Sequence, residues 1–240
     1  MKQKIACSLL CLTLFTAVFS VVRTVGRDSA KPVFAPSSRI SRTLVIDPGH
    51  GGEDGGAVSV SGVSESQVNL SIALKCDQAA GLLGVPVVLL RSEDCSLAPP
   101  EADSLREKKR GDLMRRVEVT QQTPNGWLLS IHQNKFEQPS SRGAQVFYRP
   151  SEESKGWAEL VQALLREQLD PGNHRVVKEI PESIYLMSHV SCPAILVECG
   201  FLSNPEEDAL LQQEDYQKKL AVLLMGGFLT QTTEEGIIPK

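Results

Sequence analysis

The sequence predicts an α/β fold with a mostly parallel sheet. Two observations support this: short runs of aliphatic and β-branched residues alternate with longer segments of helical periodicity, and each run ends at glycine or a polar residue. Alternation of strand and helix favours crossover connections and therefore parallel pairing. The 240 residues, of which 41% are hydrophobic, suffice for a single domain with a sizeable core.

The first half of the domain contains two predicted strands and two predicted helices. Residues 43–47 (TLVID) form a short β-branched run that ends at a turn. Residues 65–83 carry apolar side chains at near-helical spacing, and Gly84 marks the end of this helix. The apolar run 85–91 predicts a second buried strand, and the charged segment 105–121 predicts an amphipathic helix.

The middle of the chain continues the same alternation. Residues 126–132 (GWLLSIH) predict a third strand, and residues 144–149 (AQVFYR) predict a fourth. Residues 153–169 predict a helix, because Trp157 and the following leucines recur at the spacing of one helical face. Trp157 is therefore expected in the core.

The last part of the domain supplies one more strand and a long helix. Residues 182–187 (ESIYLM) are expected to form a short strand or a loop, and residues 194–200 (AILVECG) form a strongly apolar strand. Residues 205–230 predict a helix, with Pro205 in its first turn and Asn204 as its N-cap.

The segments outside the domain differ from it in composition. The uncharged stretch Ile5–Val22 predicts that residues 1–23 are a membrane anchor or a cleaved signal segment; the retained anchor is favoured, because the only cleavage-like site is poor. Residues 24–42 are rich in Pro and Ser and predict a linker. We therefore place the folded domain at residues 43–230 and a C-terminal tail at 231–240.

Charge and cysteine content exclude several classes of function. The net charge is −4 and only 5% of residues are aromatic, so no nucleic-acid partner is expected. Six cysteines are present without a CxxC motif, so neither a cysteine zinc site nor a disulfide scaffold is predicted. A pairing of Cys76 with Cys95 stays open.

Polar side chains follow three predicted strands at their carboxyl ends, where ligands bind in open α/β sheets. His50 follows residues 43–47 across a glycine-rich turn, His132 ends the third strand, and Glu198 follows four apolar residues. Glu65 opens the first helix. Two histidines and one carboxylate form the ligand set of an open zinc site. The alternative is that each histidine is a core or turn residue bonded to backbone. The HExxH and GxxxxGK[ST] motifs are absent, which excludes a zincin-type protease and a P-loop.

Several further polar residues have more than one interpretation. Asp47 is expected either to hydrogen-bond a ligand histidine or to hold an Asx turn. Asn69 is expected to tie the ligand loop or to serve only the helix, and Asn134 to orient His132, to touch substrate, or to be structural. His174 is expected on the surface, and His189 outside the site with a place in the cleft as the alternative.

Several motifs together resemble a known enzyme family. They are DPGHGGEDGGA, ESQVNL, LLRSED, SIHQN, GAQVFY and PAILVECGFLSNPEE. In this order they are similar to the motifs of the zinc-dependent N-acetylmuramoyl-L-alanine amidases of the amidase-3 type, over residues 43–229. The resemblance implies a sandwich around a six-stranded sheet, peptidoglycan as substrate and Zn²⁺ as cofactor.

The resemblance also assigns roles to individual positions. It places the zinc ligands on His50, Glu65 and His132 and the catalytic carboxylate on Glu198. Gln133 departs from the family, in which most members carry alanine there, and we expect its longer side chain to narrow the cleft.

The apolar N-terminus, the short single domain and the DCSLAPPE and IYLM segments are similar to the germination-specific, spore-cortex branch of the family. This implies an extracytoplasmic protein, membrane-anchored or secreted, in the intermembrane space of the forespore. It also implies joint action with a muramic acid deacetylase in muramic-δ-lactam formation and leaves open a need for an activator protein. The alternatives are vegetative wall turnover or cell separation, and a non-catalytic peptidoglycan-binding protein.

Overall fold

The computed structural model describes residues 42–234. The predicted anchor and nearly all of the predicted linker lie outside the described residues, as does the end of the predicted tail. Within the part that the structure describes, no helix combines the length and apolar character needed to cross a bilayer.

A six-stranded, mostly parallel sheet forms the centre of the domain, as predicted, in the order β2-β1-β3-β6-β4-β5. Every neighbouring pair is parallel except β4 with β6. The strands are β1 (Thr43–Pro48), β2 (Val87–Leu89), β3 (Gly126–Asn134), β4 (Gln145–Tyr148), β5 (Lys178–Glu179) and β6 (Ala194–Phe201).

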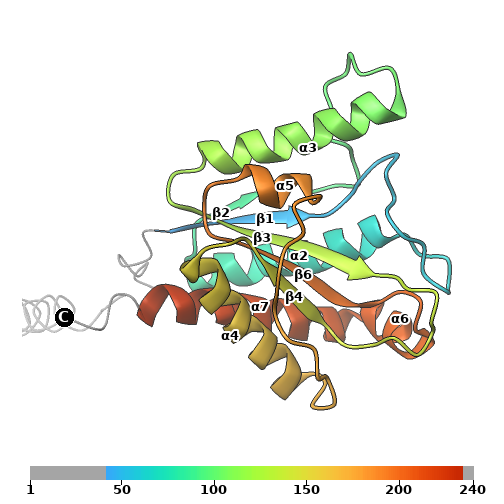
Figure 1. Cartoon of the computed structure of the whole chain (residues 1–240), viewed down its shortest axis with the longest axis vertical. Coiled ribbons are helices and arrows are strands. Elements are labelled where there is room, and N and C mark those ends of the chain that lie inside the picture. Colours follow the sequence, from blue (N-terminus) through green and yellow to red (C-terminus); the bar gives the residue numbers. More distant parts are fainter. Residues whose placement is uncertain (1–41, 235–240) are drawn as a thin grey trace, which may run out of the picture. The chain divides into compact units, whose positions relative to one another are not determined.

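Helices cover both faces of this sheet (Figure 1). The described helices are α2 (Glu65–Leu83), α3 (Leu105–Gln122), α4 (Glu152–Gln168), α5 (Tyr185–His189), α6 (Pro205–Leu211) and α7 (Glu214–Glu234). Helices α2, α4 and α7 pack on one face, whereas α3 and α5 pack on the other. The alternation of strands with helices explains this layering, since parallel neighbours need crossover connections.

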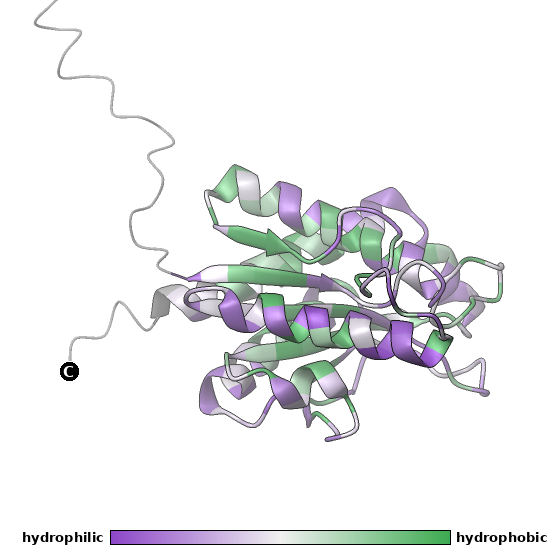
Figure 2. Cartoon of the chain, turned by 90° about the horizontal axis from the view of Figure 1, so that it is seen from above, coloured by the Kyte–Doolittle hydropathy of each residue, from purple (hydrophilic) through white to green (hydrophobic). Residues whose placement is uncertain are grey.

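Each central strand is buried on both faces, which explains its nearly continuous apolar sequence. In β1, Leu44 and Ile46 join the core beneath α2 and α7, while Val45 points to the core beneath α3 and α5. Figure 2 shows the hydrophobic strands between helices whose outer faces are more polar. Trp127 and Trp157 pack together in the first of these cores, with ring centroids 5.4 Å apart.

Helix ends follow the local sequence signals. Gly84 ends α2 in the left-handed conformation with φ of 68°, which glycine adopts without steric cost. Ser104 and Glu107 form a reciprocal capping box at the start of α3. Asn204 accepts hydrogen bonds from two backbone N–H groups of α6, confirming the predicted cap.

Two local predictions were wrong, and one strand was missed. The segment 182–187 was expected to be a strand or a loop, but its second half belongs to helix α5, which begins at Tyr185. A helix of about one turn is too short to show helical periodicity in the sequence. The predicted helix 205–230 is two helices, and the Gln217 side chain donates a hydrogen bond to the Leu211 carbonyl at the break. The two-residue edge strand β5 was not predicted, since both of its side chains are exposed.

Candidate active site

Three neighbouring parallel strands bring the predicted site residues to one edge of the sheet. In the register of β3 and β6, His132 lies opposite Glu198. In the register of β1 and β3, Asp47 lies opposite Ser130, and His50 follows two residues after β1 ends. Glu65 reaches the same point from the first residue of α2.

His50, Glu65 and His132 converge tightly. His50 Nε2 lies 3.3 Å from Glu65 Oε2, and His132 Nδ1 lies 2.9 Å from Glu65 Oε1. The two imidazole rings meet edge to face, with centroids 5.0 Å apart. One ligand atom from each residue lies within 4.8 Å of the others, so the cluster is consistent with a metal site. Two imidazole nitrogens and one carboxylate suit Zn²⁺ and leave a coordination position for water or substrate.

Glycines make this convergence sterically feasible. A Cβ at Gly49 would lie 2.2 Å from the ring of His132, so only glycine lets the chain pass this side chain. A Cβ at Gly56 would lie 2.6 Å from Glu65 Oε2. His50 itself has a φ of 61°, an uncommon conformation for a non-glycine residue, which the surrounding loop imposes.

Hydrogen bonds fix the carboxylate of Glu65 from several sides. Its two oxygens accept bonds from the backbone N–H groups of Ala57 and Gln133, at 3.0 and 3.2 Å. The amide of Asn69 donates to Glu65 Oε1 at 3.3 Å and to the carbonyl of Gly49 at 3.1 Å. Burial alone would raise the pKa of Glu65, but hydrogen bonds and charge from the two histidines hold it far below its usual range. Glu65 is therefore ionised and preorganised.

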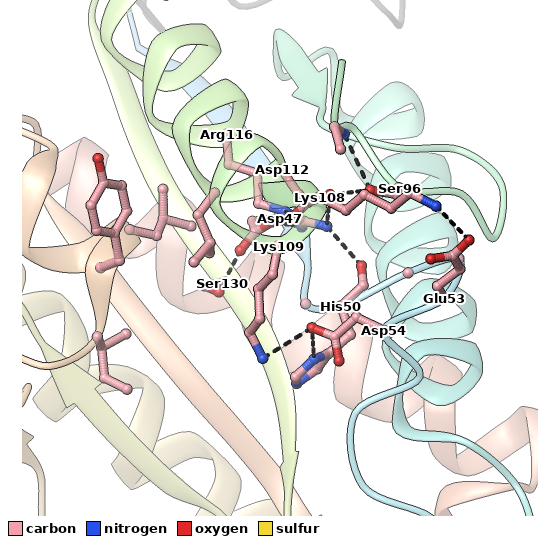
Figure 3. Close-up of a pocket in the computed structure, with 18 of the residues that line it drawn as sticks. Asp47, His50, Glu53, Asp54, Ser96, Lys108, Lys109, Asp112, Arg116 and Ser130 are labelled. Carbon is pink, nitrogen blue, oxygen red and sulfur yellow. Dashed lines mark hydrogen bonds and ion pairs between the residues drawn. The ribbon is translucent and has the colours of Figure 1, made fainter. Parts of the chain in front are cut away.

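The second ring nitrogen of His50 also has a carboxylate partner. His50 Nδ1 lies 3.1 Å from Asp54 Oδ2, and Lys109 Nζ from α3 lies 3.3 Å from the same oxygen. Figure 3 shows Lys109 and the ring of His50 joined to the same Asp54 oxygen. Burial would lower the pKa of His50, but the hydrogen bonds and charges of Glu65 and Asp54 outweigh burial and raise it. Asp54 thus fixes the orientation of the ring and leaves Nε2 facing Glu65.

Two buried arginines hold the backbone of the glycine-rich loop. Arg116 of α3 donates to the carbonyls of Pro48 and His50, at 2.9 and 2.7 Å. Arg91 donates to the carbonyls of Pro48 and Gly49, both at 3.0 Å. These bonds satisfy carbonyls that would otherwise be buried without partners.

Asp47 does neither of the things predicted for it. Its carboxylate pairs with Arg116 and accepts a hydrogen bond of 2.6 Å from Ser130 Oγ (Figure 3). Burial alone would raise the pKa of Asp47, but the Arg116 charge and the Ser130 hydroxyl hold it below its usual range. Asp47 therefore anchors Arg116, which in turn holds the loop that carries His50.

Glu198 is the least compensated acid of the site. Its Oε2 atom is buried and has no hydrogen-bond partner among the described residues. Burial and the nearby Glu65 carboxylate raise the pKa of Glu198 to about 7, against the opposing charges of His132 and His50. A carboxyl group with this pKa can accept and release a proton near neutral pH.

A cleft of about 850 Å³ opens over these groups, between α3 and α5. Its floor includes His50, His132 and Glu198, and one wall carries Ile184 and Tyr185. The site is therefore accessible to a ligand larger than a single amino acid.

The other polar candidates do not line the cleft. Gln133 is only 3% exposed and donates to Asn69 Oδ1 beneath Glu65, so its side chain does not narrow the cleft as we expected. The Asn134 carbonyl accepts a hydrogen bond from Leu202 N. His174 is exposed beside a separate surface hollow, and His189 stacks on Tyr185 with ring centroids 3.8 Å apart.

Sequence reasoning missed Asp54, Arg116 and Lys109. One signal was available: Lys108, Asp112 and Arg116 recur every four residues on α3, and all three face the glycine-rich loop or its neighbours. Four-residue spacing places side chains on one helical face, so a charged stripe of this kind can mark a contact surface.

Comparison with known proteins agrees with the geometry. A family model described as N-acetylmuramoyl-L-alanine amidase (Amidase_3) matches residues 44–229. The germination-specific N-acetylmuramoyl-L-alanine amidase of Bacillus subtilis (strain 168) is 36% identical over 230 residues, which cover 95% of this chain and 93% of the relative. The amidase LytC of the same organism is 30% identical, and the match spans 78% of this chain and 35% of the relative.

Solved structures show the same similarity in three dimensions. The CwlD amidase from Clostridioides difficile, determined in complex with the GerS lipoprotein, matches with a TM-score of 0.77 and 36% identity, over 80% of this chain and 99% of that chain. An N-acetylmuramoyl-L-alanine amidase from Clostridium difficile 630 matches with a TM-score of 0.71 and 28% identity, over 82% of this chain and 100% of that chain. The chain belongs to the Amidase_3 family of N-acetylmuramoyl-L-alanine amidases.

Proposed function

We propose that this chain hydrolyses the amide bond between the lactyl group of N-acetylmuramic acid and L-alanine in peptidoglycan, with Zn²⁺ held by His50, Glu65 and His132. The observation that carries the proposal is the convergence of these three side chains at the floor of one cleft, beside Glu198, whose buried Oε2 atom has no hydrogen-bond partner among the described residues. Zinc in such a site supplies Lewis acidity, which polarises a carbonyl group and acidifies water.

The protein groups supply positioning and proton transfer. Glu198 accepts a proton from the attacking water and passes it to the nitrogen of the leaving L-alanine, so that the products are a lactyl carboxylate and a peptide with a free N-terminus. Burial raises the pKa of Glu198 and so helps this carboxyl keep the proton between the two transfers. Asp54 and the loop carbonyls bound by Arg91 and Arg116 keep the His50 ring in place throughout.

We further propose that the enzyme acts outside the cytoplasm, tethered by residues 1–23, in formation of the muramic δ-lactam of spore cortex. The similarity to a germination-specific amidase supports this role. Removal of the stem peptide would expose muramic acid to a deacetylase, after which the sugar can cyclise. The complex of the similar CwlD amidase with a lipoprotein supports an activator partner for this chain as well.

Vegetative wall turnover or cell separation is the alternative role, because the family match by itself specifies the amidase activity and not when the enzyme acts. The two roles separate in a deletion strain: loss of δ-lactam from the cortex supports the first role, and unchanged δ-lactam with defective cell separation supports the second. A reporter fused at Lys240 that is active only in the cytoplasm would contradict the extracytoplasmic placement.

The chemistry itself is tested by mass spectrometry of muropeptides after digestion of purified cell wall. We expect free stem peptides beginning with L-alanine and peptide-free glycan, both abolished by a chelator and restored by Zn²⁺. The variant His132→Ala should lose bound zinc by elemental analysis; full zinc occupancy in that variant would contradict its ligand role.

A further inference from the structure

A second, smaller hollow adjoins the active-site cleft on the surface of α3. It has a volume of about 350 Å³ and is lined by Arg106, Lys109, Arg110, Leu113 and Tyr185. We refer to these five residues as the α3 groove. Lys109, Leu113 and Tyr185 also line the main cleft, so the groove is a branch of the cleft.

The side chains that line the groove include three cations and no acid. Among residues 42–234, Arg106 and Arg110 have no carboxylate partner, whereas other cations of α3 do: Lys108 pairs with Glu53 at 2.8 Å, and Arg115 pairs with Glu118 at 2.8 Å. Arg106 and Arg110 lie four residues apart on one helical face, where like charges repel. Arg106 also lies in the first turn of α3, next to the positive end of the helix dipole, where an anion rather than a cation is favoured. Both effects are relieved when an anion binds.

The groove lies close to the reacting atoms. Lys109 Nζ is 3.3 Å from Asp54 Oδ2, which is 3.1 Å from His50 Nδ1. In Figure 3, Lys109 extends along the edge of the cleft beside His50. A peptide that leaves the cluster in extended form advances roughly 3.5 Å per residue, so its second and third residues can reach the groove.

We infer that the α3 groove binds the acidic stem peptide of the substrate, with Arg106 and Arg110 contacting its free carboxylates. The inference rests on the proposed amidase function and assigns the orientation of the substrate in the cleft. The glycan on the other side of the scissile amide is uncharged, whereas the stem beyond L-alanine carries carboxylates. Charge complementarity therefore places the peptide over α3, with Leu113 and Tyr185 packing against its aliphatic parts.

The inference is tested with two substrates, an N-acetylmuramoyl tripeptide with free stem carboxylates and the same compound with those carboxylates amidated. The wild type should have about tenfold higher kcat/KM on the acidic compound, and the preference should shrink as salt rises from about 50 to about 500 mM. In the variant Arg106→Gln/Arg110→Gln the preference should disappear, with KM for the acidic compound raised about tenfold and a much smaller change in kcat. Arg115→Gln is the matched control, because Arg115 lies on α3 outside the groove and pairs with Glu118.

Equal loss of activity on both compounds, or an unchanged preference in the double variant, would overturn the inference. Binding of the free acidic stem tripeptide, measured by calorimetry on the full chain, gives a readout that does not need turnover. About tenfold weaker binding to the double variant supports the groove even if neither compound is hydrolysed, in which case only the proposed amidase function fails. Equal binding to both proteins overturns the groove assignment alone.

Discussion

His132 of β3 lies opposite Glu198 of β6 in the parallel ladder of the sheet. Side chains of register partners point to the same face, so a predicted metal ligand and the predicted proton acceptor are set beside each other by backbone hydrogen bonds. The separation of these two groups is therefore set by the pairing of two central strands of the sheet.

Replacing Glu198 by glutamine should abolish turnover without loss of zinc. The variant keeps the shape of the side chain but cannot accept a proton, so we expect kcat to fall by about 10²-fold or more. Zinc content by elemental analysis and release of L-alanyl amino groups measure the two properties separately. Normal activity in this variant would remove Glu198 from the mechanism.

The metal-free protein should lose stability as pH rises through neutrality because of Glu198. Its pKa is raised from 4.5 to about 7, so the native state binds the proton more tightly than the unfolded state does. The resulting stabilisation is complete at low pH and is lost between pH 4.5 and about 7, and the full effect is on the order of 1–3 kcal/mol. The free energy of unfolding, measured by urea denaturation of the metal-free proteins, should therefore increase for Glu198→Gln relative to the wild type as pH rises from 4.5 to 8. A difference that does not change with pH would contradict the raised pKa.

Asp54→Ala should weaken zinc binding by about 10- to 100-fold, because His50 loses the partner that orients its ring. Asp54→Asn can still accept a hydrogen bond and should recover part of the affinity. Glu53→Ala is the control, since the exposed Glu53 side chain pairs with Lys108 rather than with either histidine. Competition with a chromophoric chelator measures the affinity; equal values for Asp54→Ala and Glu53→Ala would exclude the orienting role.

Gly49→Ala should disrupt the site, whereas Gly55→Ala should not. The new methyl group at Gly49 would lie 2.2 Å from the His132 ring, while at Gly55 the nearest atom is 3.6 Å away, an ordinary contact distance. We expect Gly49→Ala to bind zinc at least about tenfold more weakly through displacement of His132. Isothermal titration of both variants with Zn²⁺ compares them directly, and wild-type affinity in Gly49→Ala would argue against the close approach.

Arg116→Gln should cost about 3–5 kcal/mol of folding free energy, because it leaves Asp47 buried without its cation. Arg115→Gln, one position along α3, removes only an exposed ion pair and should change stability by less than about 1 kcal/mol. Urea unfolding of the two metal-free variants makes the comparison. Similar losses for both would mean that Arg116 does not hold the loop.

The convergence of His50, Glu65 and His132 was predictable because each stands next to an element boundary that the sequence marks clearly. Parallel pairing then brings strand ends to one edge, whatever the details of register. The contacts of Arg116 were not predictable in this way. Its bond to Asp47 joins residues 69 positions apart, and nothing in local periodicity selects that partner from the other acids.

The contrast between features that the local sequence marks and contacts between distant residues also explains the errors in the predicted secondary structure. The long helices α2 and α4 were predicted because several turns repeat the same apolar spacing. Helix α5 has five residues and strand β5 has two. Elements this short carry no periodic pattern, because they are stabilised by hydrogen bonds and packing with neighbouring elements. Gln133 shows the third kind of error: the direction of its side chain, near the end of β3, depends on the shift in strand register between His132 and Asn134.

Trp127 and Trp157 pack side by side in the core beneath α4 and α7, on the face of the sheet opposite the cleft, and they are the only tryptophans of the sequence. The intrinsic tryptophan fluorescence should consequently change when this core unfolds. It should not change when a ligand binds in the cleft on the opposite face of the sheet. A single optical signal can thus separate variants that fail to fold from variants that fold and merely fail to bind.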